Sequence, residues 1–277
     1  MIKNVIVDSL TVFLLNCVMS VICPKIRREL YKQGALGTAF LVLISTTLGF
    51  LDSAKLATSF LIISGISWFY VLVNCHGKLH LNFDPKSERR FLKLGIGNRL
   101  TLTRGLLIGA TAGFIGTDPS TLSKFAVFLP AIFYTVAAIG DALDGYIARV
   151  TMQTTQLGSE LDNELDAFGL LIAPVLAVLW DKLHFTYLIV SAAFYVFRLG
   201  INLRKHQEKP VYELIPNRFR RRLAGYQMGL VATSLWAPVP AELTKPVGIL
   251  LMIPLLIRFL LDWFQTSGRI KKNDRKI

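Results

Sequence analysis

The sequence predicts an all-α, polytopic integral membrane protein, from its hydropathy and the placement of its basic residues. Of its 277 residues, 53% are hydrophobic, and the mean hydropathy is +0.50. Apolar runs close to a bilayer's thickness recur along the whole chain. At about 1.5 Å rise per residue, a helix of near twenty residues crosses a hydrocarbon core of about 30 Å. This distribution favours a membrane protein over one or two soluble domains of the same length.

The N-terminal part is expected to form a transmembrane hairpin. The apolar runs 35–51 and 56–73 are separated by only four residues, 52–55. A further run, 5–23, is interrupted by Asp8 and Asn16, so a spanning helix and an interfacial helix are equally good interpretations.

A basic connector follows the hairpin. Arg89 and Arg90 stand beside apolar residues, which predicts a short amphipathic helix on the membrane surface within 76–99, with a solvated linker as the alternative. Six further apolar segments then predict a six-helix transmembrane core. These segments are 100–116, 125–148, 165–180, 185–203, 223–239 and 246–264. The expected division is an N-terminal hydrophobic segment and hairpin (1–75), a basic connector (76–97), a core (98–266) and a basic tail (267–277).

Basic residues predict the orientation. Of the 31 Lys and Arg residues, 22 fall in the segments 24–33, 76–99, 204–222 and 268–277. The short loops between them hold about one each, so the rich segments are expected in the cytoplasm. Because the net charge of +13 lies in connecting segments, we expect a membrane surface and no nucleic acid as partner. The three cysteines have no CxxC spacing and predict neither a disulfide framework nor a zinc site.

Four aspartates form the most informative pattern in the chain. Asp141 and Asp144 are spaced i, i+3, and Asp162 and Asp166 are spaced i, i+4, so each pair projects from one face of a helix. At ~5 Å and an effective dielectric of ~20, two carboxylates repel by roughly 3 kcal/mol. Such a cluster near the ends of membrane helices calls for a cation. Oxygen ligands alone favour Mg²⁺ or Mn²⁺ over zinc.

The residues between the aspartates point to a phosphate ligand. Gly145 and Ala148 remove bulk, which allows a neighbouring helix or a ligand to approach closely. Arg149 adds a guanidinium suited to a phosphate oxygen. Together these features describe a metal-bound pyrophosphate site.

This stretch resembles the signature of the CDP-alcohol phosphotransferase (CDP-alcohol phosphatidyltransferase) family. The pattern reads Asp, two residues, Asp-Gly, two residues, Ala-Arg, eight residues, Gly, three residues, Asp, three residues, Asp. All eight positions match: Asp141, Asp144, Gly145, Ala148, Arg149, Gly158, Asp162 and Asp166. The resemblance covers residues 98 to about 264. It implies a six-helix, usually dimeric membrane core that transfers a substituted phosphate from a CDP-linked donor to an alcohol and releases CMP.

The resemblance also implies residue roles. Asp141, Asp144 and Asp162 would hold two divalent cations, and Asp166 would lie near the second and act as general base. The expected contacts to the CDP moiety are Asn98, Thr101, Arg104, Gly145, Ala148, Arg149, Thr155 and Gly158.

Read without the resemblance, several of these residues have plainer interpretations. Asn98 and Thr101 could cap a helix, and Thr155 could be an ordinary loop threonine. Arg104, inside an apolar run, could extend to the membrane surface, or face the carboxylates or a phosphate.

Arginines further along the chain are candidates for contacts to the acceptor. Arg198 lies within an apolar run and should face a polar cavity. Arg220 and Arg221 follow in a basic segment, which the positive-inside signal and lipid headgroup contacts also explain. Asp262 is expected to pair with Arg258 at i, i+4.

These observations favour a phospholipid-synthesis enzyme with its active site on the cytoplasmic face. It would transfer a phosphatidyl group from CDP-diacylglycerol to a small alcohol of the glycerol phosphate, inositol phosphate or serine class. One alternative is transfer from a CDP-amino alcohol to diacylglycerol. Another is an inactive, metal-binding membrane scaffold, and a third is a transporter, which would not explain the Gly-Ala-Arg pattern.

Overall fold

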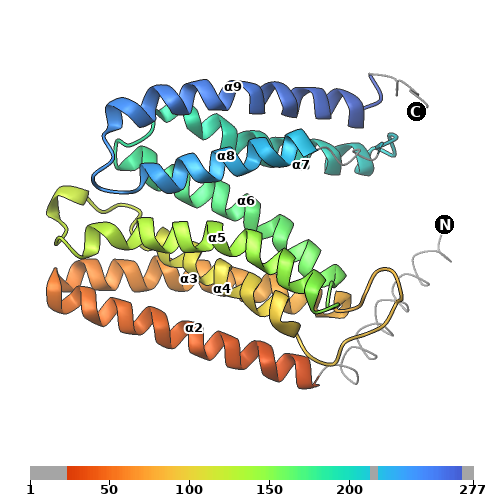
Figure 1. Ribbon diagram of the computed structural model, residues 1–277, viewed down its shortest axis with the longest axis horizontal. Coiled ribbons are helices and arrows are strands. Elements are labelled where there is room, and N and C mark those ends of the chain that lie inside the picture. Colours follow the sequence, from red (N-terminus) through yellow and green to blue (C-terminus); the bar gives the residue numbers. More distant parts are fainter. Residues whose placement is uncertain (1–23, 213–217, 270–277) are drawn as a thin grey trace.

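The computed structural model describes residues 24–212 and 218–269, and within these ranges it is helical apart from turns, loops and one isolated bridge between Phe83 and Arg90 (Figure 1). Its α-helices there are α2 (Pro24–Leu51), α3 (Ala54–Lys78), α4 (Gly95–Ala112), α5 (Leu129–Val150), α6 (Gln156–Leu179), α7 (Leu188–His206), α8 (Arg218–Ser234) and α9 (Ala241–Thr266). The predicted all-α architecture is confirmed. The run 5–23 and the tail from 270 lie outside the described residues.

Hydropathy along these helices confirms a multi-pass membrane protein. Five helical stretches in the described ranges are long and apolar enough to cross a bilayer: Pro24–Leu51, Ala54–Leu81, Ala126–Val150, Phe185–His206 and Ala241–Thr266. The other three helices, α4, α6 and α8, do not meet the same criteria of length, hydropathy and few charged residues. For α4 and α6 the reason is plain, because they carry most of the polar residues of the candidate site described below.

The predicted N-terminal hairpin is present as α2 and α3. The two helices are separated by Asp52 and Ser53, and the Ser53 side chain caps α3 by accepting a hydrogen bond from the Leu56 N–H at 3.2 Å. At the far side of the turn, Asp52 accepts hydrogen bonds from the N–H and the hydroxyl of Ser123, which precedes α5. The hairpin is therefore tied to the core at this end.

Helix α4 is the centre of the molecule, packed against α2, α3, α5 and α6. A row of glycines, Gly105, Gly109 and Gly113, allows α3 to approach it closely. A Cβ at Gly113 would lie 2.4 Å from the Phe60 ring, and one at Gly105 would lie 2.7 Å from Val71. Small residues allow helices to pack closely in membranes, where van der Waals contact supplies much of the association energy.

Alternating helix directions bring the described parts of the predicted basic segments to one end of the bundle (Figure 1). At this end Glu29 at the start of α2 pairs with Arg99 at the start of α4, and Lys78 at the end of α3 pairs with Glu164 near the start of α6. At the opposite end, Lys182 donates hydrogen bonds to the carbonyls of Ala237 and Val239 in the connection between α8 and α9. We call the first end, which holds Glu29 and Arg99, the basic end.

The connector between the hairpin and α4 corrects one prediction. Residues 82–94 form an ordered loop and no amphipathic helix. The Asn82 side chain donates hydrogen bonds to the carbonyls of Phe91 and Lys93, at 3.0 and 2.9 Å. Asp84 closes a turn, and hydrogen bonds from the Ser87 hydroxyl and the Lys86 N–H hold the pKa of its carboxyl below the ordinary value. These polar contacts satisfy the backbone without a helix.

Candidate active site

The four aspartates meet because α5 and α6 are joined by a short reversal. Asp141 and Asp144 lie in the last three turns of α5, which ends at Val150, while Asp162 and Asp166 lie in the first three turns of α6. Carboxylate oxygens of Asp141, Asp144 and Asp162 all lie within 4.8 Å of one another. The sequence spacing therefore produces one cluster at the basic end.

Arg104 of α4 joins all four carboxylates. Its Nη2 lies 2.6 Å from Asp141 and 2.9 Å from Asp166, and its Nη1 lies 2.7 Å from both Asp144 and Asp162. The residue is only 1% exposed. Of the interpretations left open for this arginine, the structure selects the one in which it faces the carboxylates.

The charges of this cluster do not balance. Four carboxylates surround one guanidinium, so three negative charges remain if all four are ionised. The Asp144 side chain is 7% exposed, whereas those of Asp162 and Asp166 are 42% and 40% exposed and reachable from outside. A cluster of carboxylate oxygens with excess negative charge fits hard divalent cations such as Mg²⁺ or Mn²⁺.

A second layer of hydrogen bonds supports the cluster. Thr101 donates to Asp144 at 3.0 Å. Asn98 exchanges hydrogen bonds with Thr155, whose hydroxyl oxygen also accepts from the Gly158 N–H at 2.9 Å. Thr155 is thus the N-cap of α6 and no ordinary loop threonine. Asn98 and Thr101 lie inside α4, which begins at Gly95, so the capping interpretation for these two is wrong.

The small residues of the signature sit where side chains would collide. A Cβ at Gly158 would lie 2.6 Å from the Asn98 oxygen, and one at Gly97 would lie 3.1 Å from the Ala148 Cβ. Gly145 lies under the Arg149 guanidinium, and a Cβ at Gly145 would lie 3.2 Å from the Arg149 Nη1. Close approach of α4 to α5 and α6 is therefore one function of Ala148 and Gly158.

Arg198, the acceptor candidate whose side chain the structure describes, lies apart from this cluster. Arg198 makes a two-pronged ion pair with Glu164, at 2.5 and 2.7 Å, and Lys78 binds the same carboxylate at 3.0 Å. Glu164 lies two residues from Asp162 and from Asp166, which is about 200° around the helix from each. The side chains of Arg220 and Arg221 lie outside the part that the structure describes. The expected Arg258–Asp262 pair is present at 2.7 Å.

Two buried polar residues near the site were not singled out from the sequence. Asn82 is 3% exposed and accepts a hydrogen bond from Asn98. Tyr134 is 1% exposed, and its hydroxyl has no hydrogen-bond partner among the described residues. Tyr134 precedes Asp141 by seven residues, so the two share a helix face, and this spacing was the available signal. No comparable local signal marks Asn82, because its partners are distant in sequence.

The fold and the site define a class: a polytopic helical membrane protein whose carboxylate cluster can hold divalent cations. Residues 94–264, more than half of the chain, match the family model described as CDP-alcohol phosphatidyltransferase. The chain belongs to this family, and the resemblance drawn from the signature is confirmed. A comparison with curated proteins gives no significant match. Membership supports a transferase that takes a CDP-alcohol donor and an alcohol acceptor in a membrane.

Proposed function

We propose that the protein synthesises a phospholipid by transferring a phosphatidyl group from CDP-diacylglycerol to a small alcohol, with release of CMP. The acceptor belongs to the glycerol phosphate, inositol phosphate or serine class. The observation that carries the proposal is the cluster of four aspartates around Arg104, in a chain whose family acts on CDP-alcohols.

Metal binding is assigned to Asp141, Asp144 and Asp162, with Asp166 near a second ion. The carboxylate oxygens of Asp141, Asp144 and Asp162 are close enough to bind one ion together, since they lie within 4.8 Å of one another. Two Mg²⁺ or Mn²⁺ ions would polarise the diphosphate and stabilise the departing CMP. Arg104 holds the carboxylates together and offsets part of their mutual repulsion.

Asp166 is proposed as the general base. Its Oδ1 accepts a hydrogen bond from Arg104, which orients the carboxylate, and its side chain is 40% exposed. An acceptor hydroxyl can therefore reach it, whereas Asp144 is buried and occupied by Thr101 and Arg104. Proton removal by a positioned carboxylate contributes typically about 10²–10⁴-fold to a rate.

Contacts to the CDP moiety are proposed for the residues that surround the cluster. The exposed Arg149 guanidinium suits a diphosphate oxygen. The remaining proposed contacts are Asn98, Thr101, Arg104, Gly145, Ala148, Thr155 and Gly158. Arg198, Arg220 and Arg221 are proposed for the acceptor; for Arg198 this requires release from Glu164.

The orientation in the membrane, the division of the chain and the oligomeric state are proposed from charge and family. We propose that the basic end faces the cytoplasm, because cytoplasmic loops of membrane proteins are enriched in Lys and Arg. The proposed units are the N-terminal segment and hairpin (1–75), the connector (76–97), the catalytic core (98–266) and the tail (267–277). A homodimer is proposed from the resemblance to the family.

The test is CMP release by the purified protein in liposomes with CDP-diacylglycerol, Mg²⁺ or Mn²⁺, and separate acceptors. We expect release that requires metal and one acceptor, and that falls at least about a hundredfold in Asp166→Asn. Asp181→Asn is the matched control, because Asp181 is 85% exposed at the opposite end of the bundle and pairs only with Lys245 among the described residues.

Other outcomes would contradict the proposal in distinct ways. Release only with a CDP-amino alcohol and diacylglycerol would reverse the donor and acceptor assignment. Metal binding by folded protein without CMP release from any donor would indicate the scaffold. Equal activity of Asp166→Asn and the parent would remove Asp166 from the role of base.

A further inference from the structure

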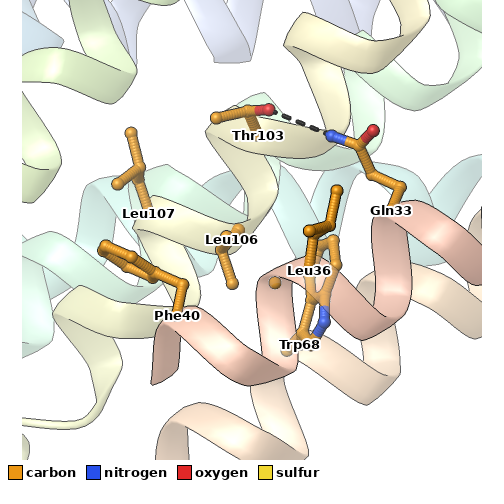
Figure 2. Close-up of a pocket in the computed structure, with 8 residues that line it drawn as sticks. Gln33, Leu36, Phe40, Trp68, Thr103, Leu106 and Leu107 are labelled. Atoms are coloured by element: carbon orange, nitrogen blue, oxygen red, sulfur yellow. Dashed lines mark hydrogen bonds between the residues drawn. The ribbon is translucent and has the colours of Figure 1, made fainter. Parts of the chain in front are cut away.

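A groove lies outside the carboxylate cluster, between the N-terminal hairpin and the core. It has a volume of about 230 Å³, and its lining includes Gln33, Leu36, Phe40, Trp68, Thr103 and Leu107 (Figure 2). The lining comes from α2, α3 and α4, and Leu36 at its edge is 70% exposed. The groove is therefore open to the outside of the helix bundle and accessible to a molecule in the bilayer.

Its polarity changes along its length. Helices α2 and α4 run in the same direction here, because Glu29 contacts Arg99 and Gln33 donates to Thr103. Figure 2 shows that last contact at one end of the groove, with Phe40 and Leu107 toward the other. From Arg99 to Leu107 the rise is about 12 Å along α4. The groove thus passes from charged, through polar, to apolar.

The groove is separate from the site of the proposed reaction. Arg99 and Thr103 each lie two residues from Thr101, so they point about 200° around α4 from it. Thr101 contacts Asp144, and the groove residues face α2 instead. A molecule in the groove is thus divided from the carboxylates by the thickness of α4.

Charge at the mouth of the groove is positive. Glu29 is countered by Arg99 at 3.1 Å, and it accepts a hydrogen bond from the Leu94 N–H at 3.0 Å, which brings Lys93 alongside. Lys93 is exposed, as is Lys32, which precedes Leu36 by one helical turn. Three basic residues and one carboxylate therefore lie beyond the polar end of the groove, near Gln33 and Thr103.

We propose that this groove binds one anionic phospholipid of the bilayer, as a resident lipid that is neither donor nor product. The headgroup phosphate lies against Lys32, Lys93 and Arg99, and one acyl chain lies along Leu36, Phe40 and Leu107. Basic pockets at helix ends attract anionic headgroups, and an apolar groove at membrane depth accepts a hydrocarbon chain. This lipid joins the hairpin to the catalytic core.

Native mass spectrometry of the detergent-purified protein tests this inference, with palmitoyl-oleoyl phosphatidylglycerol and phosphatidylcholine as competing probes. We expect one phosphatidylglycerol to be retained in preference to phosphatidylcholine. Lys32→Gln and Lys93→Gln should each lower that preference by about fivefold. Lys55→Gln is the matched control, an exposed lysine on the same hairpin at the opposite end, and should leave the preference unchanged.

Two further arms locate the lipid. Leu36→Trp fills the groove from an exposed position, so it should reduce retention of both lipids, while the unfolding temperature of the delipidated protein stays that of the delipidated parent. Saturating CMP with Mg²⁺ should not displace the lipid, since the proposed nucleotide site lies across α4. Displacement by CMP, equal retention of the two lipids, retention unaffected by Leu36→Trp, or a dimer that covers the groove would each overturn the proposal.

Discussion

The two faces of α6 carry ionic clusters of opposite composition. On one face the Glu164 carboxylate is held by two cations, Lys78 and Arg198. On the other face the Arg104 guanidinium is shared by four carboxylates. The first cluster has the cations it needs and joins α3, α6 and α7. The second has three excess negative charges when all four carboxylates are ionised, which divalent cations would offset. The comparison shows that charge balance, more than the presence of ion pairs, separates a structural cluster from a candidate metal site.

The largest effect is expected from removing the cation of the unbalanced cluster. Arg104→Gln leaves four carboxylates facing one another, and breaking a buried ion pair costs about 3–5 kcal/mol. The unfolding temperature in detergent should fall. Adding Mg²⁺ or Mn²⁺ should raise the unfolding temperature of the variant by more than it raises that of the parent. Equal metal-induced shifts in both proteins would show that Arg104 and metal do not share the carboxylates.

A smaller effect is expected from the balanced cluster. Glu164→Gln removes a carboxylate that is 11% exposed, which leaves Arg198 without this partner and Lys78 with only its longer contact to Glu160, at 3.7 Å. The loss of charge-assisted hydrogen bonds should cost about 1.5–3 kcal/mol. The same thermal measurement should show no greater metal rescue than in the parent. A larger Mg²⁺-induced rise in unfolding temperature than in the parent would mean that Glu164 and the four aspartates interact electrostatically across α6.

Arg198→Gln separates stability from acceptor binding. The Arg198 side chain is 48% exposed, so losing its pair should cost no more than about 1 kcal/mol. Because Arg198 is proposed to bind an acceptor phosphate, the KM for a phosphorylated acceptor should rise about tenfold, equivalent to ~1.4 kcal/mol. Serine has no phosphate and is the control acceptor: if the enzyme accepts serine, the KM for serine should not change. An unchanged KM would confine Arg198 to its pair with Glu164.

The smallest effect is expected at the opposite end of the bundle. Lys245→Gln removes a pair with Asp181, whose side chain is 85% exposed. Exposed pairs contribute about 0–1 kcal/mol, and this variant should match the parent in unfolding temperature and CMP release. A fall in unfolding temperature as large as that of Glu164→Gln would show that the solvent exposure of an ion pair does not predict its contribution to stability.

The candidate site was predictable where the argument depended on spacing along one helix. Asp141 with Asp144, and Asp162 with Asp166, share helix faces at fixed offsets, and the structure brings all four into one cluster around Arg104. The hairpin was predictable from two apolar runs and a short turn. The helix expected around Arg89 and Arg90 was wrong, because Asn82 and Asp84 supply hydrogen bonds that a local pattern does not reveal.

The membrane class, the helical architecture and the family signature could all be predicted from the amino-acid sequence, because hydropathy and the 3.6-residue period depend on residues close together in the chain. The partners of Arg104, which binds the carboxylates, and of Arg198, which binds Glu164, became clear from the packing of the helices. The groove between α2 and α4 likewise exists only in three dimensions. These contacts join helices separated by tens of residues, and several partners satisfy the same local pattern, so packing selects among them.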